Sequence, residues 1–94
     1  MAQVAPSVQQ HIDLLLSGLL ERWNELPQVV HTIDDWDVVD QINYMEEWPL
    51  VEQRLKILAG YAAEGSMNPD QRRQYDVLLK IVERHRHLVA RLYD

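Results

Sequence analysis

Apolar residues recur along most of this chain at spacings of three and four residues, which is the periodicity of amphipathic helices. Over residues 7–26 this pattern places one apolar face opposite Asp13, Glu21 and Glu25. Ser7 can cap the helix, and Pro27 predicts its end, because the residue before a proline disfavours the helical conformation. The apolar face comprises Val8, Ile12, Leu15, Leu16, Leu19, Leu20, Trp23 and Leu26.

Two shorter helices are predicted over residues 34–47 and 49–63, because Trp48-Pro49 interrupts the pattern in the same way as Pro27. Thr32 or Asp34 is expected to cap the first of them, and Gly65 to cap the end of the second. The side chains expected to face the core in the first helix are Val38, Val39, Ile42 and Met45. Those expected in the second are Leu50, Val51, Leu55, Leu58, Tyr61 and Ala62.

The last helix, over residues 69–93, has the strongest start signal, with Asn68 as cap and Pro69 at the first position. Its apolar arc covers more than half of the circumference, so we expect it to be the longest and most central helix. The expected core positions are Tyr75, Leu78, Val82, His85, Val89 and Leu92, with Val77, Ile81 and Leu88 widening the arc. Together the patterns predict an all-α protein, a single domain over residues 1–94 folded as an antiparallel bundle of about four helices.

Composition narrows the classes of function. The chain of 94 residues has no cysteine, which excludes a disulfide framework, a thiolate nucleophile and a zinc–thiolate site. The first ten residues contain no base and no apolar run, so we expect no secretory signal. Leu14–Leu16 is as long an apolar run as any in the chain, far below the roughly 20 residues of a membrane span. We therefore expect a cytoplasmic protein that does not cross a membrane.

Charge is distributed unevenly along the sequence. The net charge is −6, but residues 1–47 hold nine acids and one base, whereas residues 48–94 hold eight bases and six acids. The two halves thus carry net charges of −8 and +2. Such polarity favours a protein that meets a partner, or its own copy, through opposite charges.

The segment His31–Pro49 concentrates acidic and aromatic side chains and contains no lysine or arginine. Acids near the start of a helix need no function, because the helix dipole favours negative charge there. Helical spacing nevertheless places an aromatic pair among carboxylates on what is expected to be the outward face. The predicted partner-binding residues are Trp36, Asp37, Asp40, Tyr44, Glu47 and the neighbouring Trp48. Aromatic side chains supply anchor area and carboxylates attract a basic partner.

A basic stripe runs along the last helix, where Arg73, Lys80, Arg84 and Arg91 share one face. It is typical of a solvated helix face, and it can also dock an acidic partner or follow a phosphate backbone. The net acidity and the lack of interleaved aromatic residues count against nucleic acid as the partner.

Catalytic and metal-binding chemistry has little support. Glu83 and His87 stand one helical turn apart, but two ligands without a third make a weak metal site. His85 falls on the apolar side and is expected to be a hydrogen-bonded core histidine. We predict no catalytic residue, metal or cofactor, although a small helical enzyme or metal site using Glu83, His85 and His87 remains an alternative.

The leading hypothesis is a non-enzymatic protein–protein interaction module that binds a basic protein, as adaptors and toxin-neutralising proteins do, or associates with a second copy. We expect a homodimer. Nucleic-acid binding through the basic stripe is the second hypothesis.

Overall fold

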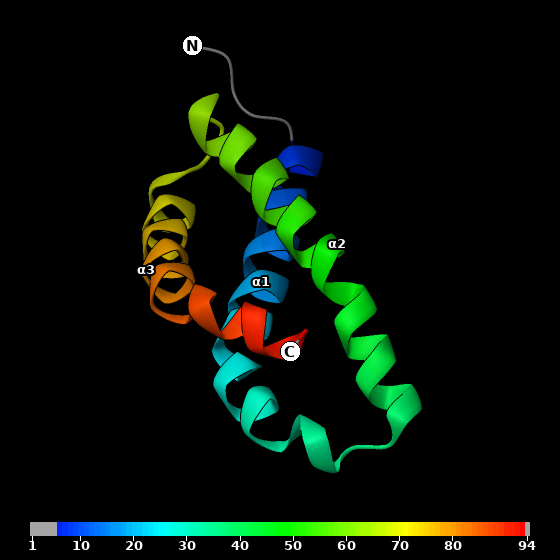
Figure 1. Ribbon diagram of the computed structural model, residues 1–94. Coiled ribbons are helices and arrows are strands. Elements are labelled where there is room, and N and C mark those ends of the chain that lie inside the picture. The colour runs from blue at the N-terminus through cyan, green and yellow to red at the C-terminus, as the bar shows by residue number, and fades with distance from the viewer. Residues whose placement is uncertain (1–5, 94) are drawn as a thin grey trace.

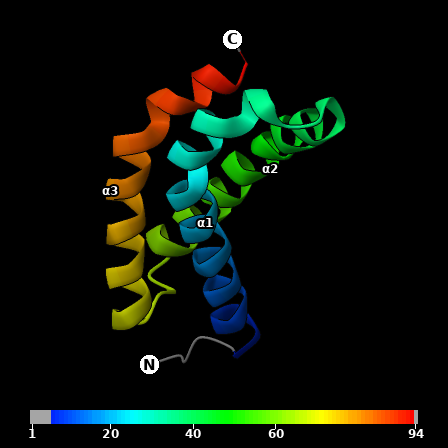
Figure 2. The same cartoon turned by 90° about the horizontal axis from the view of Figure 1, so that it is seen from below.

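The protein is all-helical, and the computed structural model describes residues 6–93. Three long helices and one 3-10 turn follow in the order α1 (Pro6–Thr32), η1 (Ile33–Asp35), α2 (Val38–Ala63) and α3 (Pro69–Leu92). Figures 1 and 2 show α1 in the middle, with α3 along one side of it and α2 along the other. The domain predicted over 1–94 includes residues 1–5 and 94, which lie outside the described residues.

The central helix is α1, not the last helix as predicted. With 27 residues, α1 is longer than the 24-residue α3, and both other helices pack mainly against it. Its predicted apolar face is confirmed, since Ile12, Leu16 and Trp23 have no exposed surface. The wide apolar arc of α3 is only partly buried, because α3 has one main neighbour and Val77 remains 52% exposed.

Neither Pro27 nor Pro49 ends a helix, although a break was predicted at each. The described chain therefore has three long helices instead of the four predicted. A proline inside a helix leaves the carbonyl four residues earlier without its backbone donor. For Pro27 that carbonyl is Trp23 O, which accepts a hydrogen bond from His85 Nδ1 at 2.9 Å. For Pro49 it is Met45 O, which accepts one from the Tyr93 hydroxyl at 2.9 Å. α3 and the residue after it therefore satisfy both carbonyls.

Two helix ends that were predicted from capping residues are confirmed. Asn68 caps α3 by accepting a hydrogen bond from Gln71 N at 2.8 Å, and Gly65 closes α2 with a φ of 74°, as predicted. The predicted cap of the second helix is wrong. Asp37, rather than Thr32 or Asp34, accepts a bond from Val39 N at 2.8 Å, because Ile33–Asp35 forms the 3-10 turn first.

The buried face of α2 is opposite to the prediction in its first half. Tyr44, Trp48, Val51 and Leu58 are buried, whereas four predicted core residues, Val38, Val39, Ile42 and Leu50, are exposed. The cause is an aromatic cluster in which Trp48 packs edge-on against Trp23, with ring centroids 5.1 Å apart. Large aromatic rings bury more apolar area than valines do, so they face α1. Among residues 6–93, no helix has both the length and the hydropathy that crossing a bilayer requires.

Candidate functional site

Four of the six predicted partner-binding residues line one open cavity of about 560 Å³ between α1 and the start of α2. These four are Trp36, Asp40, Tyr44 and Glu47, and they are joined there by Arg22 and Asn43. The cavity brings together carboxylates from α2, one aromatic side chain from the turn before it, and a cation from α1. Such a surface can bind polar and cationic groups.

The other two predicted residues have structural roles. The Asp37 carboxylate is the α2 cap, which leaves it at the surface but directs one oxygen at the backbone. Trp48 is 2% exposed and belongs to the core. Tyr44 is also buried apart from its edge at the cavity, with its ring between Trp36 and Trp48 at centroid distances of 5.7 and 6.1 Å. The expected outward orientation of Tyr44 and Trp48 is therefore wrong.

Arg22 neutralises part of this acidic surface. Its guanidinium pairs with Glu47 at 2.5 Å and with Glu25 at 3.2 Å, and it lies 5.6 Å from the centre of the Tyr44 ring. Burial lowers the pKa of Arg22, but the carboxylates of Glu47 and Glu25 outweigh burial, so the net shift of this pKa is upward. Arg22 thus stays charged and holds α1 to α2.

The raised pKa of the Tyr44 phenol predicts that the protein loses stability at alkaline pH. Burial and the nearby Glu25 carboxylate raise the pKa of Tyr44 to about 12, although Arg22 opposes this shift. In the unfolded chain the pKa is about 10, so below that pH the phenol is neutral in both states. Between pH about 10 and about 12 only the unfolded chain ionises, which favours unfolding.

Urea unfolding at successive pH values should therefore show the free energy of unfolding falling across this window. Tyr44→Phe should remove the part of the fall that belongs to this phenol. An unchanged pH profile in Tyr44→Phe would contradict the assignment.

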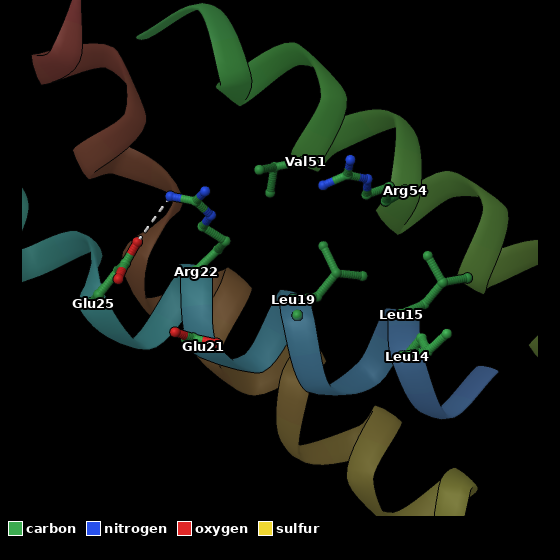
Figure 3. Close-up of a pocket in the computed structure, with 9 residues that line it drawn as sticks. Leu14, Leu15, Leu19, Glu21, Arg22, Glu25, Val51 and Arg54 are labelled. Atoms are coloured by element: carbon green, nitrogen blue, oxygen red, sulfur yellow. Dashed lines mark hydrogen bonds and ion pairs between the residues drawn. The ribbon is translucent and has the colours of Figure 1, made fainter. Parts of the chain in front are cut away.

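A second opening continues along the same pair of helices beyond Arg22. It has a volume of about 450 Å³, and Figure 3 shows Arg22 from α1 and Arg54 from α2 extending into it above Leu15 and Leu19. Gly18 lies in its wall, where an added Cβ would meet no atom within 4 Å. The two openings show that α2 covers α1 incompletely on this side.

The outer face of α2 is more apolar than the cavity. Val38, Val39 and Ile42 are 65%, 62% and 47% exposed, and Leu50 and Ile57 continue the apolar surface along the helix. A hollow of about 330 Å³ lies beside them, lined by Ile42, Met45, Glu46, Pro49 and Tyr93. We call the exposed Val38, Val39, Ile42, Leu50 and Ile57 the outer stripe.

Carboxylates without ion pairs surround the start of the outer stripe. Within residues 6–93, the acids of this region that form no ion pair are Asp34, Asp35, Asp37, Asp40 and Glu46. All five are exposed. The region therefore combines aliphatic side chains in water with uncompensated negative charge.

The basic stripe lies at the surface of α3, on the far side of α1 from α2 (Figure 2). Arg73 pairs with Asp70, while Lys80, Arg84 and Arg91 form no ion pair in the described part of the chain. At the end of α3, Arg91 lines one opening together with Asp34, so the stripe and the acidic region approach each other there within one molecule.

His85 lies on a different face of α3 from Glu83 and His87, as helical geometry predicts. His85 is half-buried and donates to Trp23 O, which confirms it as a hydrogen-bonded histidine of the helix interface. Glu83 and His87 are exposed on other faces of α3. Within residues 6–93, no three His, Asp or Glu side chains converge closely enough to hold a metal ion.

Sequence reasoning missed Arg22 and the outer stripe. Arg22 was recognisable as the one base among nine acids, but its partner Glu47 lies 25 residues away. Four of the five residues of the outer stripe, Val38, Val39, Ile42 and Leu50, were misassigned to the core because α2 is apolar on two opposite faces. The chain matches no protein-family model, no curated protein and no solved structure. Its function must therefore be argued from this geometry.

Proposed function

We propose that this protein is a non-enzymatic protein–protein interaction module whose binding surface is η1 and the outer face of α2. The observation that carries the proposal is the exposure of Val38, Val39 and Ile42 beside five carboxylates that form no ion pair in residues 6–93. The partner is a polypeptide that presents both apolar side chains and positive charge.

The apolar part supplies affinity. Single exposed aliphatic residues are normal, but neighbouring ones on one helix face form a patch, and patches rimmed by polar groups mark interaction sites. The hollow beside Ile42 and Pro49 is a concave site that a partner side chain can fill. Burial of this surface releases water from apolar area, which is the main favourable term in protein association.

The charged part supplies selectivity. Unpaired carboxylates at the rim attract basic partners and repel acidic ones, and they act chiefly on the rate of association and on its salt dependence. Trp36 and Asp40, which lie at the cavity mouth, extend this rim toward α1. Trp36, Asp37, Asp40 and Glu47 thus face the partner in this proposal. The apolar anchor is the aliphatic outer stripe instead of Tyr44 and Trp48.

Nucleic-acid binding by the basic stripe has weaker support. Of the four stripe residues, Lys80, Arg84 and Arg91 form no ion pair within residues 6–93, and the exposed Val77 lies between them and Arg73 on the same face. Within residues 6–93, this face of α3 carries no Phe, Tyr or Trp side chain that could stack on a base.

Site-specific photo-crosslinking tests the proposal, since the chain has no native cysteine to compete for the label. A benzophenone attached at Val39→Cys should crosslink to a binding partner in a cell extract, because Val39 lies in the proposed surface. The matched control is Val77→Cys on α3, which is similarly exposed and apolar. Equal products from both sites, or no product at Val39, would contradict the proposal.

A second control separates binding from folding. In the labelled Val39→Cys chain, the added substitutions Val38→Ser and Ile42→Ser should abolish the crosslinked partner while the free energy of unfolding changes by less than about 2 kcal/mol, because about half or more of each side chain is in water. Raising the salt concentration should also weaken capture, because the carboxylate rim is screened.

A further inference from the structure

We infer that the outer stripe of α2 pairs with the same stripe of a second copy, antiparallel, around a two-fold axis that passes between Pro49 and Leu50. This inference rests on the proposed function, because it names the polypeptide that the interaction surface binds. Three observations carry it: the two-faced pattern of α2, the thinness of the molecule and the distribution of charge along α2.

Two opposite faces of α2 are apolar. At about 100° per residue the outer stripe occupies an arc of about 120°, and the buried Tyr44, Trp48, Val51 and Leu58 occupy an opposite arc of about 80°. A helix with two apolar faces needs neighbours on two sides. Within one copy, α2 packs mainly on α1, and the Glu52–Arg86 ion pair and the Tyr93–Met45 hydrogen bond join it to the end of α3. Among residues 6–93 no helix covers the outer stripe.

The molecule is too thin to cover this face itself. Its principal extents are 53 × 23 × 15 Å, and the smallest is little more than the diameter of one helix with its side chains, about 10–12 Å. Figure 1 shows α2 along one side of α1 and α3 along the other. The outer stripe is therefore open to a second copy except beside Ile42, where Tyr93 lines the neighbouring hollow.

The charges of α2 favour an antiparallel second copy. The first half of α2 and the preceding turn carry the unpaired acids, whereas Arg54 and Lys56 in the second half are exposed and form no ion pair among residues 6–93. Glu52, the acid of that second half, is already paired with Arg86 at 2.7 Å. An antiparallel pair sets the acidic half of each copy against the basic half of the other, twice over. A parallel pair sets like charges together.

A two-fold axis between Pro49 and Leu50 also matches side chains by size. It places Ile42 of one copy opposite Ile57 of the other, and Glu46 opposite Gln53, whose amide can donate to the carboxylate. The bulky Val39 then meets Gly60, where an added Cβ has no atom within 4 Å. Because the interface is isologous, each favourable contact occurs twice.

Sedimentation equilibrium tests the pairing. The 94-residue chain should sediment at twice its mass of 11.1 kDa at micromolar concentrations. Ile42→Asp and Ile57→Asp should each raise the dimer dissociation constant at least about tenfold, because each places a charge in the apolar centre twice. Leu14→Asp, at a more exposed leucine on α1, is the matched control and should leave the dimer unchanged.

Charge reversal gives a second test of the register. Glu46→Arg should weaken self-association by removing the carboxylate that faces Gln53 of the other copy, and Gln53→Glu should weaken it by meeting Glu46. A mixture of the two variants should regain the dimer, because Arg at position 46 of one then faces Glu at position 53 of the other.

Spin labels at Ala63→Cys determine the orientation. An antiparallel pair places these labels about 40 Å apart along the helices, whereas a parallel pair places them at neighbouring-helix distance, about 10 Å. A short distance would overturn the inference, as would a wild-type monomer or a dimer abolished by Val77→Asp on α3. A monomer whose Val39 label still crosslinks to another protein would refute self-pairing alone and leave the proposed function standing.

Discussion

Replacing Trp48 with alanine should lower the free energy of unfolding by about 3–5 kcal/mol. The side chain is 2% exposed and packs between the rings of Trp23 and Tyr44, so its removal leaves a large cavity between α1 and α2. Trp48→Phe should cost less than half as much, since it keeps the ring contacts and removes an indole N–H that has no hydrogen-bond partner in the structure. Urea denaturation followed by circular dichroism measures both.

The matched control is Ile42→Ala on the outer face of the same helix. Its side chain is 47% exposed, so we expect a change of at most about 1 kcal/mol. If Trp48→Ala unfolded like the wild type but lost its partner, Trp48 would be an interface residue after all.

The second large effect concerns the carbonyl that Pro27 leaves without a donor. His85→Ala should destabilise the protein by about 1–3 kcal/mol, because Trp23 O then has no partner inside the molecule. In a Pro27→Ala background, residue 27 regains an N–H that can bond to Trp23 O within the helix. The cost of His85→Ala should therefore be smaller there, by about 1 kcal/mol.

This double-mutant cycle isolates the hydrogen bond, because the packing that His85 loses is the same in both backgrounds and cancels. His87→Ala, at an exposed position of the same helix, should show no coupling to Pro27→Ala. Equal costs of His85→Ala in both backgrounds would show that the histidine contributes packing alone. The corresponding cycle of Tyr93→Phe with Pro49→Ala should show a weaker coupling, since Tyr93 is 52% exposed and water competes for Met45 O.

The sequence predicts the fold well where the signals are local. The Asn68 cap, the Gly65 end and the apolar face of α1 each depend on residues within a few positions of one another, and all are confirmed. The predicted breaks at Pro27 and Pro49 failed because the groups that permit an uninterrupted helix are distant. His85 lies 62 residues from Trp23, and Tyr93 lies 48 residues from Met45.

The candidate site was only partly predictable for a related reason. Trp36, Asp40, Tyr44 and Glu47 do line one cavity; helical spacing brings the last three to one side of α2, whereas Trp36 reaches it from the turn after η1. Which side of α2 faces the core depends on Trp23, and sequence periodicity cannot choose between two apolar faces. The choice is made by the pairing of Trp48 with Trp23, which buries the aromatic face and leaves the valines in water.

The two carbonyl contacts from the C-terminal end of the chain bear on how the protein forms during translation. Trp23 and Met45 leave the ribosome long before His85 and Tyr93, which bond to their carbonyls. Until His85 and Tyr93 emerge, each of the first two helices has a weak point at its proline, where water must take the place of the missing donor. α1 and α2 therefore gain these two hydrogen bonds only after α3 has been synthesised.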